Sequence, residues 1–163
     1  MRRIVTMDMG MIMAVAGAAI AVTFSGVGSS IGIGHSAQAA NGAMSVDPKN
    51  FVNFLILSVL PGTQGIYGFV AAFFVINKIG LLGTPVALTT AQGWQIFMAC
   101  IPIAIGGWFS GIHQGKVSAA GISVAVKQEK DFMKAVIMSA LVETYAVLAL
   151  LITIMLLLFI KVG

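Results

Sequence analysis

The sequence predicts an all-α membrane protein in which four transmembrane helices form two tandem helical hairpins. Composition is the first reason, because 59% of the 163 residues are hydrophobic and 9% are charged, whereas about a quarter of the residues in a soluble domain are charged. The second is a set of four apolar runs, each longer than the roughly 20 residues that a helix needs to cross a bilayer. The third is an internal repeat that relates the two halves of the chain. No room remains for a separate soluble domain.

The four apolar runs give the helices in chain order: Met9 to about Gly34, Phe51 to Ile76, Trp94 to about Val126, and Phe132 to Ile160. Inside a bilayer every backbone polar group must be hydrogen-bonded within its own segment, so runs of this length are helical. We expect residues 1–80 to form the first hairpin and residues 81–163 the second. A secretory signal is the competing interpretation of the first run, because "MRR" precedes it and "SAQAA" resembles a cleavage site. The run is too long for the core of a signal peptide.

The first and third runs carry small residues at a spacing of four, whereas the second and fourth runs carry bulk. Small residues on one helical stripe let two backbones approach closely. The large side chains are Phe69, Phe73 and Phe74 in the second run and a leucine-rich end in the fourth run. Large apolar side chains suit positions that face lipid. The predicted packing stripes are Ala14, Ala18, Val22, Gly26, Ser30 and Gly34, and Gly107, Gly111, Gly115, Ala119 and Ser123.

The internal repeat is seen in "FSGVGSS" at residues 24–30 and "FSGIHQG" at residues 109–115, so Phe24 is paired with Phe109. The same offset superposes the two small-residue stripes. Each half therefore resembles the other as a hairpin with a thin first helix and a bulky second one. The second half carries an acidic residue within its last run, where the first half has "PGTQ" at residues 61–64.

Glu143 is the only residue between Ala135 and Ile160 that is charged at neutral pH. A carboxylate at the centre of a bilayer costs at least about 2.5 kcal/mol and by default indicates a functional site. Three more oxygen-bearing side chains share its depth. Glu143 is 12 residues from Asp131, Gln114 is 13 from Lys127, and Thr63 and Gln64 are 13 and 14 from Asn50. At about 1.5 Å per helical residue, all four side chains lie about 18 to 21 Å from the loops on one side of the membrane.

Pro61 precedes Thr63 and Gln64, and a proline within a helix removes a hydrogen bond and frees nearby backbone carbonyls. Glu143, Gln114, Thr63, Gln64 and a freed carbonyl offer several hard oxygen ligands and one negative charge. Because divalent sites usually recruit more than one carboxylate, this set favours a monovalent cation such as Na⁺. The alternative is a protonated Glu143 that is hydrogen-bonded in the interior, with Gln114 and Thr63 bridging neighbouring helices.

Several function classes are excluded by the sequence. The net charge of +4 is not clustered with aromatic residues, so a nucleic-acid surface is not expected. "SGIHQGKVS" has Ser110 where the phosphate-binding loop needs glycine and Val117 where it needs serine or threonine, so no ATP site is expected on this chain. The single cysteine, Cys100, is interpreted as an apolar packing residue.

Three motifs together resemble the duplicated proteolipids of V-type ATPases, the K or c-type rotor ring proteins, and more narrowly those of bacterial sodium-translocating enzymes. They are "VLPGTQGIYGF" at residues 59–69, "FSGIHQGK" at residues 109–116 and "VETYA" at residues 142–146. The resemblance covers nearly the whole chain. It implies a homo-oligomeric rotor ring of four-helix subunits, with the first and third helices inside and the second and fourth outside.

The resemblance also implies the ligands of the transported ion. In such rings Na⁺ is held by residues matching Glu143, Gln114, Thr63, Gln64 and the backbone carbonyl of Leu60. The residue matching Tyr67 steadies the carboxylate. All of these residues are present, and His113 beside Gln114 is a local variation that leaves the ligands untouched.

The partners implied by the resemblance are further copies of the chain, an a-type (I) stator subunit with an essential arginine, central-stalk subunits and membrane lipid. ATP hydrolysis would take place on other subunits, so this chain would be a non-catalytic part of the enzyme. The loops at residues 39–50 and 127–131 are the expected stalk-facing ends. The expected location is the bacterial cell membrane, as a multi-pass protein.

Three competing functions stay open at this point. A ring that carries H⁺ needs only Glu143, so the polar residues around it would be superfluous. A small four-helix multidrug exporter would use one essential glutamate and work as a small oligomer. A purely structural membrane protein would not need the carboxylate for transport.

Overall fold

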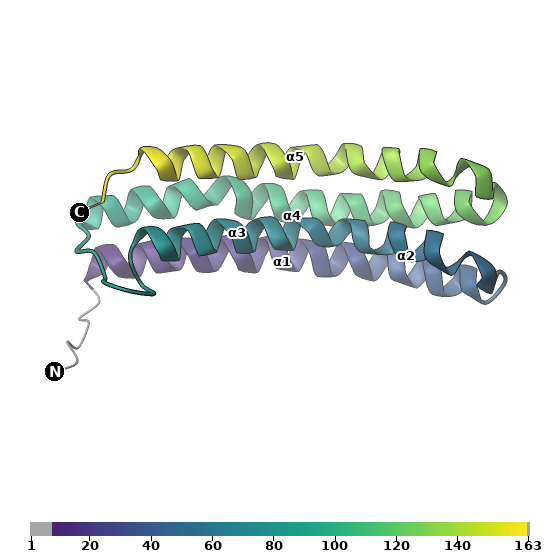
Figure 1. The fold of residues 1–163 in the computed structure, drawn as a ribbon, viewed down its shortest axis with the longest axis horizontal. Coiled ribbons are helices and arrows are strands. Elements are labelled where there is room, and N and C mark those ends of the chain that lie inside the picture. The colour runs from purple at the N-terminus through teal and green to yellow at the C-terminus, as the bar shows by residue number, and fades with distance from the viewer. Residues whose placement is uncertain (1–7, 163) are drawn as a thin grey trace.

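The computed structural model describes residues 8–162, and these form a bundle of four long rods lying side by side (Figure 1). The described part of the chain contains four helical segments long and apolar enough to cross a membrane. The elements are α1 (Met9–Met44), the 3₁₀ turn η1 (Pro48–Asn50), α2 (Phe51–Val59), the 3₁₀ turn η2 (Leu60–Gly62), α3 (Thr63–Lys78), α4 (Thr90–Lys127), the 3₁₀ turn η3 (Glu129–Asp131) and α5 (Phe132–Phe159). The all-α prediction of two tandem hairpins is confirmed.

Two of the long helices, α1 and α4, begin at side-chain caps that the sequence supplies. Asp8 accepts a hydrogen bond of 2.7 Å from the backbone N–H of Met11 at the start of α1. Thr89 and Gln92 form a reciprocal capping box at the start of α4, which satisfies backbone donors that have no partner within the helix. Gly80 follows α3 with a φ of +70°, a backbone conformation that glycine adopts without steric cost.

α1 extends well beyond the first predicted run, because it continues to Met44 rather than ending near Gly34. Hydropathy marks where a helix leaves the hydrocarbon, and not where its backbone stops being helical. The extension is rich in alanine, and its Asn41 is exposed, so it needs no fully apolar surroundings. The chain turns into η1 at Pro48.

The second span is one rod with a local break. α2 and α3 follow each other along the same line in Figure 1, joined by η2 at Leu60–Gly62. Pro61 lies in this turn, as expected of a residue that cannot donate the helical hydrogen bond. Thr63 begins α3 and donates its hydroxyl to the Leu60 carbonyl at 3.1 Å.

α1 and α4 run side by side and touch closely through glycine. A Cβ atom at Gly111 would lie 2.6 Å from the carbonyl carbon of Gly28, and one at Gly28 would lie 2.6 Å from the Cα of Trp108. Gly107 and Gly115 are in similar contact with Ser25 and Gly32 of α1. The prediction that the small residues of α4 allow close packing is therefore confirmed for Gly107, Gly111 and Gly115.

The α1 stripe predicted to pack does not do so within the chain beyond its first residues. Gly26 and Gly34 have nothing within 4 Å of an added Cβ atom, and Ser30 is exposed. A constant step of four residues advances by about 40° per step around a helix with about 3.6 residues per turn. A stripe that starts on the buried Ala14 and Ala18 therefore drifts onto the open face.

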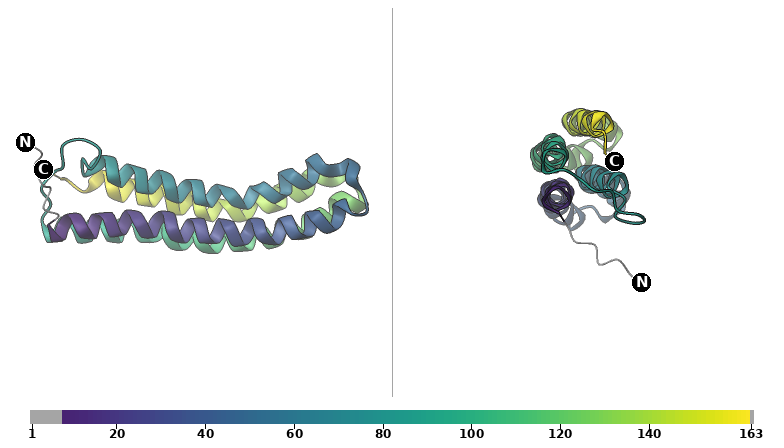
Figure 2. Two further views of the ribbon diagram at one scale, coloured as in Figure 1. Left: turned by 90° about the horizontal axis from the view of Figure 1, so that it is seen from below. Right: turned by 90° about the vertical axis from the view of Figure 1, so that its left-hand side faces the viewer.

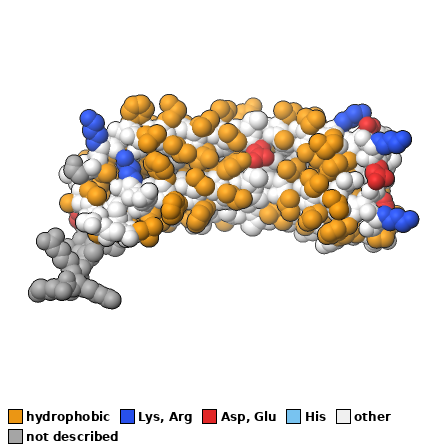
Figure 3. Space-filling model, viewed as in Figure 1, with side chains coloured by type: hydrophobic (Ala, Val, Ile, Leu, Met, Phe, Trp, Pro, Cys, Tyr) orange, Lys and Arg blue, Asp and Glu red, His pale blue; other side chains and the backbone are white. Residues whose placement is uncertain are grey.

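Seen end on, the bundle has two layers, with α1 and α4 in one and α3 and α5 in the other (Figure 2). α5 buries the smallest share of its surface among the four spans. Figure 3 shows charged side chains gathered at the two ends of the bundle and a long hydrophobic surface between them. Acidic side-chain atoms, coloured red, are visible midway along this surface. The molecule is a multi-pass integral membrane protein, and Cys100 is buried in its apolar core as predicted.

Candidate ion-binding site

Glu143 is held between α4 and α5 by a neighbouring amide. The Gln114 Nε2 donates to Glu143 Oε2 at 3.3 Å. Gln114 is completely buried, whereas Glu143 is half-buried. The carboxylate therefore lies at the edge of the polar cluster and the amide at its centre.

Tyr67 reaches the same carboxylate from α3. Its hydroxyl donates to Glu143 Oε1 at 2.5 Å, so the two carboxylate oxygens have separate donors. Because Tyr67 and Glu143 come from different hairpins, this contact ties the two halves of the chain together at the level of the site.

Gln64 extends the network into the interior. Its Nε2 donates to Gln114 Oε1 at 2.5 Å and to the Ser110 hydroxyl at 3.1 Å. Gln64 has no exposed surface. A buried amide of this kind is stable only when its polar atoms have partners, and here the partners lie on α4.

Thr63 and the Leu60 carbonyl complete the cluster at the break between α2 and α3. The Thr63 hydroxyl donates to the Leu60 carbonyl oxygen and also lies 3.4 Å from Gln64 Oε1. The Thr63 hydroxyl has one proton to share between these two oxygens, so Thr63 places both of them beside the hydrogen bonds that lead from Gln64 through Gln114 to the Glu143 carboxylate. All the residues predicted to share one depth are brought together.

Ser110 belongs to this network and was not predicted from the sequence. Its hydroxyl accepts from Gln64 and donates to the Val142 carbonyl at 3.0 Å. Ser110 lies one helical turn before Gln114 on the same face of α4, and that spacing was the signal that could have identified it.

The carboxylate borders a groove on the outside of the bundle. The groove is lined by Ala140, Glu143, Thr144, Val147 and Leu148, all from α5. Its walls are otherwise nearly apolar. The carboxylate therefore faces the side of the bundle rather than its long axis.

The chemistry of the cluster suits a monovalent cation. It offers one carboxylate, two side-chain amides, a hydroxyl and a backbone carbonyl, all of which have hard oxygen atoms. Within residues 8–162, no three His, Cys, Asp or Glu side chains come together. The other acidic residues in this part of the chain, Asp8, Asp47, Glu129 and Asp131, lie at or between the helix ends. The cluster therefore has one carboxylate, whereas a divalent ion would favour two.

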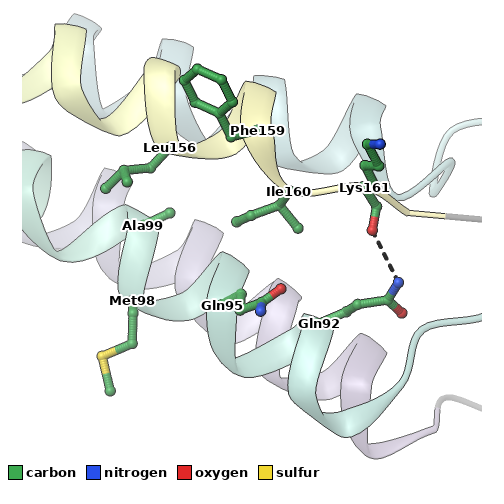
Figure 4. A pocket seen from close by; sticks show the side chains of 8 residues that line it. All are labelled: Gln92, Gln95, Met98, Ala99, Leu156, Phe159, Ile160 and Lys161. Atoms are coloured by element: carbon green, nitrogen blue, oxygen red, sulfur yellow. Dashed lines mark hydrogen bonds between the residues drawn. The ribbon is translucent and has the colours of Figure 1, made fainter.

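A separate pocket lies at the end of the bundle where α4 begins and α5 ends (Figure 4). Met98, Leu156 and Phe159 give it apolar walls, and Gln92 Nε2 donates to the Lys161 carbonyl at 3.0 Å. Leu156 lies about 20 Å from Glu143 along α5. The pocket is remote from the carboxylate and offers no comparable set of oxygens.

Comparisons with known proteins agree on one family. The model of that family, described as the C subunit of ATP synthase, matches the chain twice, over residues 16–75 and 97–156. The V-type sodium ATPase subunit K of Enterococcus hirae is 43% identical, over 95% of this chain and 96% of that protein.

Two more distant relatives are subunits of an ATP synthase and of a proton ATPase. The A-type ATP synthase subunit K of Methanocaldococcus jannaschii is 33% identical over 90% of this chain and 62% of its own length. The 16 kDa proteolipid of the V-type proton ATPase of Nephrops norvegicus is 25% identical over 87% of each chain.

The two matched segments confirm the internal repeat and correct its register. They begin at residues 16 and 97 and end at residues 75 and 156. This offset pairs Ser30 with Gly111, whereas the FSG motifs predicted that Gly26 pairs with Gly111. The structure agrees, because Gly111 lies against Gly28 and Gly32, the positions on either side of Ser30. The two FSG tripeptides are therefore displaced by one helical turn.

Proposed function

The chain belongs to the family of the ATP synthase C subunit, as a duplicated proteolipid of the V-type ATPase rotor, and we propose that it carries Na⁺ bound at Glu143. The observation that carries this proposal is the polar cluster of Glu143, Gln114, Gln64 and Thr63, contributed by α3, α4 and α5 at one depth. Rotation of the ring, coupled to ATP hydrolysis on other subunits, would move the ion. Residues 1–80 and 81–163 would form its two repeats.

The proposed ligands are the Glu143 carboxylate, the side-chain oxygens of Gln114, Gln64 and Thr63, and the Leu60 carbonyl. In the hydrogen-bonded arrangement Gln114 turns its NH₂ group toward Glu143. A cation beside the carboxylate needs an oxygen there instead. Half a turn of the Gln114 amide supplies it without moving the backbone. Because Gln64 Nε2 donates to Gln114 Oε1, the Gln64 amide would turn as well, so that its own oxygen accepts from the Gln114 NH₂ group.

Charge neutralisation would couple ion binding to rotation. A bare carboxylate facing hydrocarbon costs several kcal/mol. Because Glu143 borders an apolar groove on α5, an empty site would resist turning into the lipid. Na⁺ or H⁺ bound at the carboxylate removes the net charge and lets the site pass.

Ion release requires a competing positive charge on the stator. An arginine on an a-type (I) subunit would pair with Glu143 through a charge-assisted hydrogen bond and displace the cation. Tyr67 and Gln114 already donate to the carboxylate, so they would stabilise its charge in the interval. Further copies of the chain, central-stalk subunits and the lipid of a bacterial cell membrane are the remaining proposed partners.

One chain would carry one ion for two hairpins. With the repeat that takes residue 16 to residue 97, the first-hairpin equivalents of Glu143 and Gln114 are Gly62 and Ile33. These residues offer no side-chain oxygen. A ring of such chains would use more ATP for each ion than an unduplicated ring and could support a steeper gradient.

Na⁺ is favoured over H⁺ by the polar residues behind the carboxylate. A proton needs only one carboxylate oxygen as its partner. Gln64 and Gln114 are nevertheless completely buried behind Glu143, and burying two amides has a desolvation cost. A bound Na⁺, which needs several oxygen ligands, gives these amides a role. The relative with 43% identity has sodium in its name, and the relative with 25% identity has proton. Family membership leaves the multidrug exporter and the purely structural protein without support.

Carbodiimide labelling of Glu143 in the purified ring tests the proposal. Millimolar Na⁺ at constant pH should slow the labelling, because the reagent attacks a protonated carboxyl group and bound Na⁺ excludes the proton. Choline chloride at equal ionic strength is the control. Labelling that is indifferent to Na⁺ but slows as the pH rises would favour H⁺.

A further inference from the structure

The break between α2 and α3 leaves a backbone carbonyl without its helical partner. Leu60–Gly62 form a 3₁₀ turn, in which an N–H bonds to the carbonyl three residues earlier instead of four. The Gly62 N–H is therefore no longer directed to the Ser58 carbonyl, as it would be in a continuous α-helix. The end of α2 needs a donor from elsewhere in the bundle.

The first turn of α3 has the complementary deficiency. The first N–H groups of a helix have no carbonyl partner within it, and the side chain of the residue before the helix often accepts from the third helical residue. That preceding residue is Gly62, which has no side chain, and α3 has no side-chain cap of its own. The N–H of Gly65, the third residue of α3, therefore depends on an acceptor from another helix.

Two serines of α1 supply the missing partners. Ser29 Oγ accepts from the Gly65 N–H at 2.7 Å. The Ser36 hydroxyl has one proton, and its nearest acceptor is the Ser58 carbonyl at 3.0 Å, whereas the two carbonyls of its own helix within reach are at 3.2 Å. Both serines are buried. Ser29 thus caps the start of α3, and Ser36 caps the end of α2.

The spacing of the two serines matches the break. Ser29 and Ser36 are seven residues apart, just under two turns, so they lie on one face of α1. Their two partners are also seven residues apart, in a span that runs antiparallel to α1 (Figure 1). Gly32 lies between the serines, and a Cβ atom there would lie 2.8 Å from Pro61 Cβ. This face of α1 therefore makes room for the proline and caps the helix ends on either side of it.

The second hairpin has no such break and lacks one of these serines. The repeat that takes residue 16 to residue 97 makes Ser110 the equivalent of Ser29 and Val117 the equivalent of Ser36. α5 is a continuous helix over Phe132–Phe159. Because valine has no hydroxyl, the second cap occurs in the hairpin whose second span is broken and not in the other.

The capped break carries two of the proposed Na⁺ ligands. The Leu60 carbonyl accepts from the backbone N–H and from the hydroxyl of Thr63, and the same hydroxyl lies 3.4 Å from Gln64 Oε1. Leu60 and Thr63 lie between Ser58 and Gly65 in the chain. The positions of their oxygens therefore depend on how the two helix ends are held.

We propose that Ser29 and Ser36 are positioning residues of the ion site. They cap the two helix ends at the break and so hold the Leu60 carbonyl and the Thr63 hydroxyl in place for Na⁺. The inference rests on the Na⁺ site proposed above. Both serines act through backbone groups and neither is a proposed ligand, so their effect falls on the affinity for Na⁺ and not on the protonation of Glu143.

Ser29→Ala and Ser36→Ala in the purified ring test the inference. Each change should raise the Na⁺ concentration that half-protects Glu143 from carbodiimide by up to about fivefold, the change in a binding constant that corresponds to a lost helix cap. The pH dependence of labelling without Na⁺ should stay the same, because a proton binds the carboxylate alone. A change that merely loosened the bundle would alter both measurements.

Ser25→Ala is the matched control. Ser25 is also a completely buried serine of α1, and its hydroxyl donates to the Ile103 carbonyl of α4 at 3.0 Å. Loss of this hydrogen bond should lower the temperature at which the ring dissociates. It should leave Na⁺ protection unchanged, because Ser25 caps neither helix end at the break.

Hydrogen–deuterium exchange tests the caps without reference to ions. In Na⁺-free buffer, the Gly65 amide should exchange faster in the Ser29→Ala ring than in the wild-type or Ser25→Ala ring, because its acceptor has been removed. Equal exchange in all three rings would overturn the cap assigned to Ser29.

The outcomes separate this inference from the proposed function. A wild-type ring protected by Na⁺, with unchanged half-protection in both Ser29→Ala and Ser36→Ala, would overturn the positioning role alone. Equal losses of Na⁺ affinity in these variants and in Ser25→Ala would also overturn it. A wild-type ring that Na⁺ does not protect would contradict the proposed function and this inference together.

Discussion

The Tyr67 hydroxyl lies 2.5 Å from Glu143 Oε1, so a residue of the first hairpin holds the only carboxylate within α5. The proposed ion site thus belongs to the contact between the hairpins and not to either of them. Any change that separates α3 from α5 will also loosen the carboxylate.

Tyr67→Phe should weaken Na⁺ binding while the ring still assembles. The substitution removes one hydrogen bond to a charged group, which is worth about 1.5 to 3 kcal/mol when buried. Because Glu143 is half-buried, we expect the low end, about a tenfold loss of affinity. The Na⁺ concentration that half-protects Glu143 from carbodiimide measures it, and an unchanged value would show that the phenol does not steady the site.

Glu143→Gln should abolish Na⁺ transport and carbodiimide labelling without preventing ring formation. The amide keeps the size of the side chain and one of its oxygens, but it lacks the charge that a cation must neutralise. Transport is measured as ATP-driven uptake of radioactive Na⁺ into vesicles containing the reconstituted enzyme. A ring with Glu143→Gln that transports at the wild-type rate would rule out the carboxylate as the carrier.

Ser110→Ala should lower both ring stability and Na⁺ affinity, although Ser110 is not a proposed ligand. The change leaves the Val142 carbonyl without its side-chain donor and Gln64 Nε2 with Gln114 as its remaining partner. An unsatisfied buried polar group costs about 1 to 3 kcal/mol. The temperature at which the detergent-solubilised ring dissociates checks the first effect, and carbodiimide protection checks the second.

Ser45→Ala provides the comparison for that experiment. Ser45 also donates to a backbone carbonyl, at 2.7 Å, but it is exposed. Water replaces its hydrogen bond, so neither the dissociation temperature nor the Na⁺ protection should change. Equal effects of the two substitutions on these measurements would mean that the hydrogen bonds of Ser110 do not stabilise the network.

Depth in the membrane was the feature of the site that the sequence could predict. A helix rises about 1.5 Å per residue, so counting from the loops was enough to place Gln114, Thr63 and Glu143 at one level. Contacts around the helix axis depend on angle as well as on depth. Ser110 shares a face of α4 with Gln114 but lies one turn, about 6 Å, away in depth, so a search for a single level missed it. Whether these residues bind Na⁺ stays a prediction.

The fold shows the same division between what a sequence can and cannot determine. Four helices and their hairpins follow from apolar length. The stripe on α1 that faces α4 instead alternates steps of four and three, through Ala21, Ser25, Gly28 and Gly32. Only the position of α4 reveals which of the small residues on α1 face it, because glycine and alanine occur on several sides of this helix.

Gly111→Ala and Gly42→Ala should have opposite effects on stability. At Gly111 the added methyl group would lie 2.6 Å from the carbonyl carbon of Gly28, and this atom cannot move without shifting α1. Overpacking of this kind costs about 1 to 3 kcal/mol. At Gly42 nothing lies within 4 Å, so alanine should stabilise the end of α1 by up to about 1 kcal/mol through its higher helix propensity. Ring dissociation temperatures of both variants measure the difference, and a Gly111→Ala ring as stable as the Gly42→Ala ring would contradict the close approach of α1 and α4.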